Sequence, residues 1–549
     1  MADKTYDVVI AGGGQKGLVL AMYLTKFAGL SVGLFEERHE LGAGWSSEEA
    51  APGWVANTHS NNHQGHYHTP LYWDFPEWKD YGARYAYSRT SQATVFEEDD
   101  KVVAQYSCYP EVDPTQEKTA ALLSRFSQKD ADTYLRLWRS TVEKWYPAMQ
   151  EWVFNPATPF GQPDALERLL MDPDSGVDPI WLYQSILQTF SNLFEDPHVQ
   201  ISNFRTLQSY GYQNDQPGMG FSALLTVFAM LPHHVYSVGG THSLTHAAYR
   251  VIFENGGEAW TNNKVEKIII ENGKAKGIRL ADGTEVEAKV AVVTNLDPYQ
   301  LVFELLGPEN VSDEIATKIK NLERDWVTIH WWSWAFSERP QWKCEAFEPD
   351  VWDCMWMCLG DLDLKGFLKE SSERKLGQWP SKMYMAVSYM GQNEANEWDQ
   401  CMAPVEFGFK TLTEQFTIPA YLWSDEEWKK HEPEYADAVV KRINQYAPNI
   451  TWDTVVGYLP ITPYYTARLA RNYAPAGNWA TIDNTPSQLG RFRPIPELAN
   501  HRVPGIENFY CTGTAWHPFA LAWSPQGYNC YKIMAEDLGL KKTWEGRPF

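Results

Sequence analysis

The sequence has no long hydrophobic run, little positive charge and few cysteines. No stretch approaches the roughly 18 uninterrupted apolar residues of a membrane-spanning helix, so we expect no transmembrane segment. Lys and Arg total 47 against 70 for Asp and Glu, and the net charge of −23 repels phosphate, which excludes nucleic acid as an expected partner. The seven cysteines are scattered and do not form the pattern of a disulfide framework.

What the chain does have is length and a large apolar fraction. Its 549 residues suggest two domains, and 44% hydrophobic residues are enough for packed cores. The N-terminus runs directly into a strand pattern and a glycine turn, which leaves no room for a secretory leader. We therefore expect a cytoplasmic protein.

A strand, a glycine turn, a helix and a second strand follow one another near the N-terminus. Residues 6–11 are a β-branched run typical of a buried parallel strand, residues 17–24 are typical of an apolar helix, and residues 31–35 have the next strand pattern. Between the first strand and the helix, residues 12–17 read GGGQKG and fit the G-x-G-x-x-G turn of dinucleotide-binding units.

Each glycine of this turn has its own physical task. Gly12 permits the tight turn, Gly14 lets the backbone approach a pyrophosphate, and Gly17 lets the helix pack on the strand. Glu36 closes the second strand roughly 20 residues after the last glycine, where a carboxylate accepts hydrogen bonds from ribose hydroxyls and repels the 2′-phosphate of NADP. FAD and NAD share this ADP half, so the turn alone does not separate them.

Two further regions extend this unit. Residues 37–45 place a second small-residue turn directly after the ribose carboxylate, where a longer cofactor would need further backbone contacts. Residues 265–270, 275–280 and 286–293 are strand patterns separated by Asn-Gly and Asp-Gly, which predicts a three-stranded antiparallel meander.

The C-terminal region adds a strand and a helix. Residues 508–514 have a short strand pattern that ends in a glycine, and a helix is expected over residues 526–538. The N-terminus of this helix would set backbone N–H groups and a positive dipole end against a buried anionic group.

The order of these elements resembles the FAD-binding half of the phytoene desaturase and amine oxidase superfamily, and more closely its phytoene-dehydrogenase-like branch. The landmark segments are residues 35–44, 216–220, 238–241, 447–449, 462–463, 493–494, 511–518 and 525–529. The likeness spans nearly the whole chain.

The resemblance implies an α/β fold with two domains. One is a Rossmann-like FAD-binding domain, a central parallel sheet with an antiparallel meander, made of residues 1–75, 235–300 and 485–549. The other is an α+β substrate domain inserted between these segments, made of residues 76–234 and 301–484.

The resemblance also implies where FAD is held. The expected contacts are Gly12, Gly14, Gln15, Lys16, Gly17, Glu36, Glu37, Gly42, Gly44, Trp45, Val265, Asn295, Gly513, Thr514, Gln526, Gly527 and Tyr528. Residues at the start of the C-terminal helix would face the pyrimidine end of the flavin, where backbone N–H groups stabilise the charge of the reduced ring. Cys511 and Cys530 do not match the position of a covalent link, so we expect non-covalent FAD.

Four histidines lie within ten residues, at His59, His63, His66 and His68. Three interpretations stay open: a zinc or iron site, a wall of the active site, or structural hydrogen bonding. No carboxylate or thiol is interleaved before Asp74, so no metal site is predicted. His63 is the first candidate here for proton transfer.

His517 matches the histidine of the family's Thr-His-Pro element beside the flavin; the alternative is a histidine bonded only to backbone. Where the family continues with glycines, residues 519–523 read Phe-Ala-Leu-Ala-Trp. These bulky side chains would crowd the flavin and favour a compact substrate over a long polyene. The predicted catalytic residues are therefore His517, His63 and Tyr528.

We expect hydride transfer between an apolar, unsaturated or cyclic, terpenoid-like substrate and flavin N5, giving C–C desaturation or a related redox or isomerisation reaction. A second G-x-G-x-x-A pattern at residues 218–223 follows Pro217 rather than a strand, so no nicotinamide site is indicated and oxygen or a quinone is the expected electron acceptor. The alternatives are a flavin amine oxidase and a non-enzymatic escort of prenylated small GTPases that shares this fold.

Membrane contact is a further implication of the resemblance, because carotenoid members of the family attach to membranes peripherally. The aromatic-rich middle of the chain offers a surface for such contact. A net charge of −23 and a mean hydropathy of −0.44 oppose it at an anionic bilayer.

Overall fold

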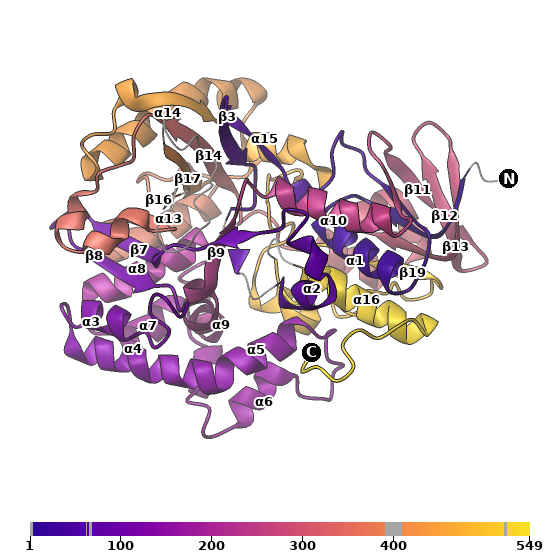
Figure 1. The fold of residues 1–549 in the computed structure, drawn as a ribbon, viewed down its shortest axis with the longest axis horizontal. Coiled ribbons are helices and arrows are strands. Elements are labelled where there is room, and N and C mark those ends of the chain that lie inside the picture. Colours follow the sequence, from indigo (N-terminus) through magenta and orange to yellow (C-terminus); the bar gives the residue numbers. More distant parts are fainter. Residues whose placement is uncertain (1–3, 62, 65–67, 390–408, 521–523) are drawn as a thin grey trace.

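The computed structural model describes residues 4–61, 63–64, 68–389, 409–520 and 524–549 (Figure 1). Two seven-stranded sheets organise the chain. The first sheet lies on the right of Figure 1, the second lies at the upper left, and a layer of helices lies below the second sheet.

The first sheet contains the strands that the sequence predicts. They are β1 (Lys4–Ala11), β2 (Val32–Phe35), β10 (Glu258–Trp260), β11 (Val265–Glu271), β12 (Lys274–Leu280), β13 (Glu285–Thr294) and β19 (Phe509–Cys511). The order β10-β2-β1-β13 is parallel, and β13-β12-β11 is the antiparallel meander. β19 pairs in parallel with the last residues of β13. The predicted α/β fold with a parallel sheet and a meander is confirmed.

Helices cover this sheet and close its core. α1 (Gln15–Lys26) packs against α10 (His242–Glu254) and α16 (Pro525–Leu538). Val8, Ile10, Val293 and the apolar residues of α1 share one buried cluster with α16. A Cβ atom at Gly527 would lie 2.5 Å from the carbonyl oxygen of Lys16, so this glycine lets α16 cross α1 closely.

The second sheet brings together strands from distant parts of the chain. In order they are β18 (Val455–Leu459), β14 (Ile329–Phe336), β17 (Phe409–Phe416), β16 (Met385–Tyr389), β15 (Met357–Gly360), β7 (Thr90–Phe96) and β8 (Val102–Tyr106). Trp332 and Trp334 of β14 pack with α14 (Asp425–Tyr446) in one buried cluster. Trp331 belongs to a different cluster, with Trp356 and Ala520.

The helical layer lies below the second sheet (Figure 1). Its helices are α3 (Glu117–Leu123), α4 (Gln128–Ser140), α5 (Tyr146–Val153), α6 (Ala165–Met171), α7 (Ile186–Leu193), α8 (Pro197–Ser209) and α9 (Gly220–Leu225). Turns, not a strand, occupy residues 210–219 before α9, as expected for a G-x-G-x-x-A pattern that is no dinucleotide turn.

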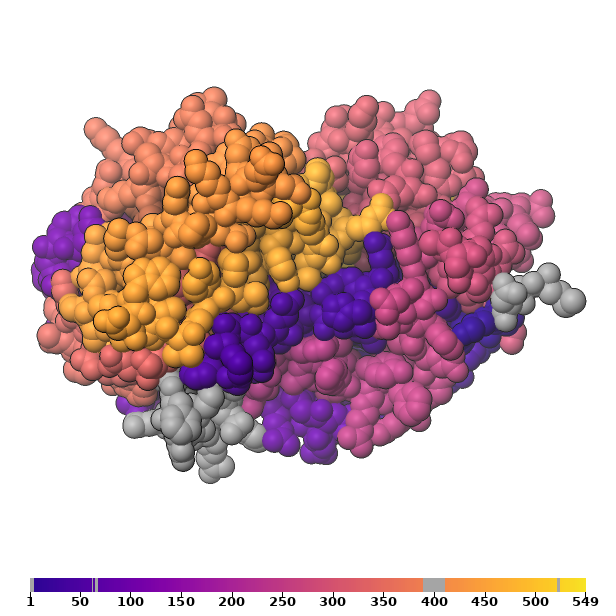
Figure 2. Space-filling model, turned by 90° about the horizontal axis from the view of Figure 1, so that it is seen from above, coloured from indigo at the N-terminus to yellow at the C-terminus, as the bar shows by residue number. Residues whose placement is uncertain are grey.

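Smaller elements complete the fold. They are β3 (Ser47–Ala51), β4 (Trp54–Asn57), β5 (His63–Gln64), β6 (Tyr85–Ala86), β9 (His234–Ser237), α2 (Thr69–Asp74), α11 (Pro298–Gln300), α12 (Asp313–Lys320), α13 (Leu364–Lys375) and α15 (Pro463–Leu469). Of the helices described, none has the length and apolar character needed to cross a bilayer. Seen from above, the orange-to-yellow part of the chain bridges the left lobe and the pink lobe on the right (Figure 2).

Candidate functional site

A polar groove lies at the carboxyl ends of three neighbouring strands of the first sheet. Gly12 follows β1, Glu36 follows β2 and Asn295 follows β13, and all three line a cavity of about 240 Å³. The cavity also touches Gly14, Glu37 and Val265. Six residues singled out in the sequence therefore surround one space at the sheet edge where ligands bind in open α/β folds.

The glycine turn beside this groove is packed too tightly to hold side chains. A Cβ atom at Gly14 would lie 2.7 Å from Nδ2 of Asn295, and one at Gly17 would lie 2.9 Å from the carbonyl oxygen of Gly12. Gly12 has a φ of +97°, a conformation that favours glycine. Gly14 caps α1 without a side-chain hydrogen bond, and the first turn holds no acidic residue. The helix therefore presents its positive end to the groove.

Glu36 is fixed by two backbone donors. The N–H of Gly13 donates to its Oε2 at 2.7 Å, and the N–H of Arg38 donates to its Oε1 at 2.9 Å. Burial raises the pKa of Glu36, opposed by these two hydrogen bonds. Each oxygen of the ionised carboxylate keeps a further acceptor site for a hydroxyl group of a ligand.

The other residues predicted around the first and second turns lie deeper. Gln15 and Lys16 are buried, and burial lowers the pKa of Lys16 well below its usual value. Gly42 adopts a φ of +103° and its N–H donates to the carbonyl oxygen of Gly13, which joins the two turns. A Cβ atom at Gly44 would lie 3.0 Å from Oε1 of Gln15. Trp45 is in the core, with its ring 5.9 Å from that of His68.

Three of the four clustered histidines can be placed; His66 lies outside the described residues. Nε2 of His59 lies 2.9 Å from Oγ1 of Thr466. Nε2 of His63 lies 3.1 Å from Oγ of Ser60, and its Nδ1 lies 3.4 Å from Nε2 of His68. Burial lowers the pKa of His59 and of His63 to about 3, so both rings are neutral at pH 7.

The same histidines bear on the question of a metal centre. Among the residues that the structure describes, no group of three or more His, Cys, Asp or Glu side chains is arranged to hold a metal ion.

The C-terminal candidates occupy different surroundings. Nε2 of His517 lies 3.1 Å from the carbonyl oxygen of Trp152, and burial lowers the pKa of His517. Gln526 donates through Nε2 to the carbonyl oxygen of Phe519 at 2.8 Å. The ring of Tyr528 packs in the core, 5.2 Å from that of Tyr23. Two predicted residues remain: Gly513 has a φ of +139° and its Cβ position lies 3.5 Å from Oδ1 of Asn295, a groove residue, and the carbonyl oxygen of Thr514 accepts from Arg493 at 3.0 Å.

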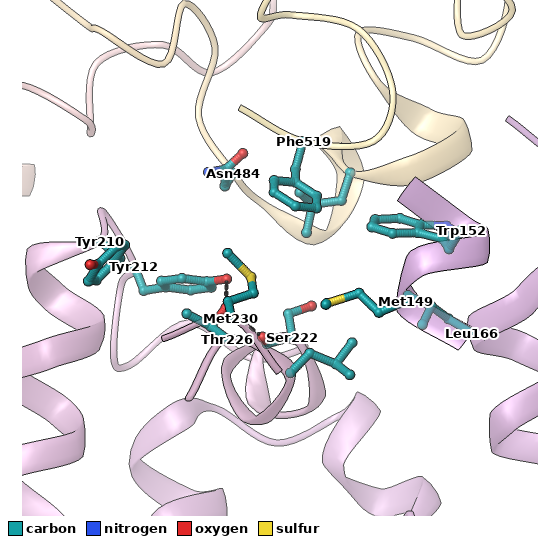
Figure 3. Close-up of a pocket in the computed structure, with 12 residues that line it drawn as sticks. Met149, Trp152, Leu166, Tyr210, Tyr212, Ser222, Thr226, Met230, Asn484 and Phe519 are labelled. Carbon is teal, nitrogen blue, oxygen red and sulfur yellow. Dashed lines mark hydrogen bonds between the residues drawn. The ribbon is translucent and has the colours of Figure 1, made fainter. Parts of the chain in front are cut away.

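A second, apolar cavity of about 60 Å³ lies between the helical layer and the C-terminal segment (Figure 3). Met149 and Trp152 of α5 line one side, Phe519 lies above, and Met230 lies below. The rings of Trp152 and Phe519 stack with centroids 5.8 Å apart. Of the bulky run predicted to crowd the flavin, residues 521–523 lie outside the described part of the chain. The lining of this cavity is mostly apolar with a few polar groups, as is typical of small-molecule sites.

Comparison with known proteins finds similarity in the glycine-turn region and along most of the chain. Residues 10–78 match the family described as NAD(P)-binding Rossmann-like domain. One of the subunits of limonene dehydrogenase from Castellaniella defragrans is 23% identical over 98% of this chain and 96% of its own length. The neurosporene-forming phytoene desaturase of Rhodobacter capsulatus is 46% identical over 13% of this chain and 14% of its own length. The chain is a relative of the phytoene desaturase-like oxidoreductases.

The fold of this oxidoreductase is shared more widely. A putrescine oxidase variant aligns with a TM-score of 0.56 at 13% identity, over 97% of this chain and 99% of its own. At that identity the likeness concerns the fold alone.

Sequence reasoning missed a groove residue of this oxidoreductase, Arg38. It lines the groove, and its Nη2 donates to Oε1 of Glu40 at 3.0 Å. Its Nη1 is buried and has no hydrogen-bond partner among the residues that the structure describes. The sequence signal that could have identified Arg38 is its position two residues after Glu36, just beyond the end of β2.

A strap of residues 468–472 was also missed. It lines the outer side of the groove, and Arg471 forms ion pairs with Glu304 and, at 3.9 Å, with Glu37. Asn472 fixes the strap to the turn after β13: its Nδ2 donates to the carbonyl oxygen of Asn295 at 3.3 Å, and its Oδ1 accepts from the N–H of Asp297 at 2.9 Å. No local pattern predicts this contact because the strap is far from the glycine turn in the sequence.

Proposed function

We propose that this oxidoreductase binds FAD non-covalently and transfers a hydride between a compact, apolar, unsaturated or cyclic, terpenoid-like molecule and flavin N5. The polar groove carries the proposal: a glycine turn, the unopposed positive end of α1, and Glu36 held by two backbone donors meet in one cavity.

The residues of the groove fit the ADP half of FAD. Glu36 would accept from the ribose hydroxyls, and the N-terminus of α1 would hold the diphosphate. The buried and unpartnered Nη1 of Arg38 supplies a charged donor where a phosphate oxygen would satisfy it. Cys511 and Cys530 are both buried in clusters of the core, which supports a non-covalent cofactor.

The two sheets support the proposed domain division. Every strand of the first sheet falls within residues 1–75, 235–300 and 485–549. Every strand of the second sheet falls within residues 76–234 and 301–484. We assign the cofactor to the first unit and most of the substrate cavity to the second.

The apolar cavity would bind the substrate and keep water away from it. Met149, Met230 and the stacked rings of Trp152 and Phe519 favour a hydrocarbon skeleton and exclude water. When bound, the flavin supplies the hydride acceptor, and the chain supplies position and a dry environment.

His517 is the proposed group for the accompanying proton. Its Nε2 donates to the carbonyl oxygen of Trp152, so Nε2 carries the ring proton and Nδ1 is the basic nitrogen. Burial lowers the pKa of His517, so the free ring is neutral at pH 7 and Nδ1 has an open lone pair, although burial also makes it a weaker base. His63 and His68 are hydrogen-bonded neighbours that could pass a proton along Ser60 and the two rings.

An anaerobic experiment tests the proposal. The purified protein should be yellow, and limonene or a cyclic ketone should bleach its 450 nm absorbance, with oxygen or a quinone restoring the colour. Bleaching by amines alone would instead identify a flavin amine oxidase. Rapid bleaching by NADH would contradict the absence of a nicotinamide site, and a colourless protein that binds no FAD would favour the non-enzymatic escort.

A further inference from the structure

The apolar cavity contains one amide whose orientation is fixed. Asn484 lines the cavity beside Phe519, opposite Ser222 and Thr226 (Figure 3). Its Oδ1 accepts from the N–H of Ala520 at 3.1 Å and from Nη1 of Arg493 at 3.3 Å. Both neighbours can only donate, so the oxygen must face them and the NH₂ group must face away.

Arg493 makes this arrangement rigid. Its guanidinium is fully buried and also donates to the carbonyl oxygens of Gln488 at 2.9 Å and Thr514 at 3.0 Å. A side chain held at so many points cannot rotate without leaving several buried acceptors unsatisfied. The amide of Asn484 is therefore set in place before any ligand arrives.

Nδ2 of Asn484 has no acceptor within hydrogen-bond distance among the residues that the structure describes. Two hydroxyl groups of the cavity, those of Thr226 and Tyr212, differ from it. Thr226 donates to the carbonyl oxygen of Ser222 at 3.0 Å, so the hydroxyl of Tyr212 must donate to Thr226 at 2.7 Å and has no proton left for a ligand. The hydroxyl of Ser222 can rotate, and on a helix it can donate a hydrogen bond to a backbone carbonyl of the preceding turn.

We infer that the molecule bound in this cavity carries an oxygen acceptor, a carbonyl or an ether, that receives a hydrogen bond from Nδ2 of Asn484. The ligand is thus an oxygenated cyclic or terpenoid molecule, not a pure hydrocarbon. The inference rests on the proposed function, because it takes this cavity as the substrate site. A fixed hydrogen-bond donor in an apolar pocket disfavours ligands that leave it unpaired. Nδ2 of Asn484 therefore favours ligands that carry an oxygen acceptor.

Limonene and carvone test this, because carvone adds a ring carbonyl to the limonene skeleton. Binding to the full-length, flavin-containing protein is measured by isothermal titration. With Nδ2 as donor, carvone should bind about three- to tenfold more tightly than limonene, the effect of one net hydrogen bond. Without a donor, burying the carbonyl would be unfavourable and limonene would bind more tightly.

Asn484→Asp is the decisive variant. It keeps an oxygen for Ala520 and Arg493, replaces the Nδ2 donor by an acceptor and adds a negative charge beside Arg493. Carvone affinity should fall at least about tenfold while limonene affinity stays within about twofold. Asn310→Asp makes the same chemical change at an exposed position and should preserve the carvone preference.

Two results would overturn the inference: wild-type protein that binds limonene as tightly as carvone, or loss of the preference in Ser222→Ala instead of Asn484→Asp. Unfolding temperatures of all variants confirm that each is folded. A yellow protein that limonene bleaches but that shows no carvone preference would refute this inference alone. A protein that binds no FAD would refute the proposed function, whatever the ligand preference.

Discussion

The polar groove is built on a tightly packed glycine turn, whereas the apolar cavity is shaped by large side chains. Gly12 and Gly14 have no room for a Cβ atom beside Leu296 and Asn295, and Glu36 is held by N–H groups. The cavity is lined by Trp152, Phe519 and other large residues. A turn that tolerates no side chain fixes one ligand geometry, while large apolar side chains can be exchanged and so change the size and preference of a cavity. The groove suits a constant cofactor and the cavity a substrate that differs among relatives.

Filling the groove should have the largest effect. In Gly14→Val the new side chain would meet Nδ2 of Asn295, whose distance to a Cβ atom is only 2.7 Å. We expect FAD affinity to fall by on the order of 100-fold, measured by equilibrium dialysis. Gly29→Ala is the control for backbone strain: its φ of +64° disfavours a side chain, but nothing lies within 4 Å of its Cβ position, so stability should fall while FAD affinity stays unchanged. A valine variant that keeps its flavin would refute the role of the glycine turn in holding FAD.

Enlarging the cavity should weaken substrate binding more than FAD binding. Trp152→Ala removes the ring that stacks on Phe519 but keeps the backbone carbonyl that accepts from His517. We expect KM to rise about tenfold and the free energy of unfolding to fall by about 2 kcal/mol, with FAD content unchanged. Trp452→Ala, at a 44% exposed position, should leave KM unaltered. Loss of flavin from Trp152→Ala would mean that the two regions are not separable.

Glu36→Gln separates cofactor binding from stability. The amide cannot accept through both side-chain atoms, so FAD affinity should fall about five- to tenfold. Burial raises the pKa of Glu36, so in the wild type FAD affinity should decrease as the pH falls through this raised pKa, and the variant should lack that decrease.

The same shift has the opposite sign for the protein without cofactor. Because the pKa of Glu36 is raised in the folded state, the protonated carboxyl favours folding. This stabilisation is lost as the pH rises through the raised pKa. Glu36→Gln should therefore not lower the free energy of unfolding of the cofactor-free protein at pH 7, measured with urea. A large loss of stability there would show that Glu36 is chiefly structural.

Opening the outer side of the groove should have the smallest effect. Arg471→Ala breaks the half-exposed ion pairs with Glu37 and Glu304. Because such pairs contribute little each, FAD release should accelerate only about two- to fivefold, and the difference from wild type should shrink at high salt. Arg250→Ala, which breaks an exposed ion pair with Glu254, should leave the release rate unchanged.

The groove could be predicted because its residues follow strand ends in one local pattern. Gly12, Gly14 and Glu36 are close in sequence, and the Asn-Gly and Asp-Gly turns mark the meander. In the second sheet, by contrast, β7 pairs with β15 more than two hundred residues later, and β14 pairs with the distant strands β17 and β18, so no local signal sets the full strand order.

The cavity was less accessible to prediction for the same reason. Met149, Asn484 and Phe519 come from segments far apart, and only packing brings them together. The sequence marks the bulk after His517, where Phe519 forms part of the cavity wall, but it cannot show that Asn484 is oriented by Ala520 and Arg493. The catalytic roles of His517, His63 and Tyr528 stay predictions.

The pairing of β19 with β13 has a consequence for biosynthesis. β13 ends at residue 294 and its partner begins at residue 509, so more than two hundred residues emerge from the ribosome before this sheet is complete. Until then the last residues of β13 form an uncovered edge, and α1 packs against α10 but still lacks α16. The first sheet is therefore completed only after residues 509–511 have been made, and its exposed strand edge favours non-native pairing until then.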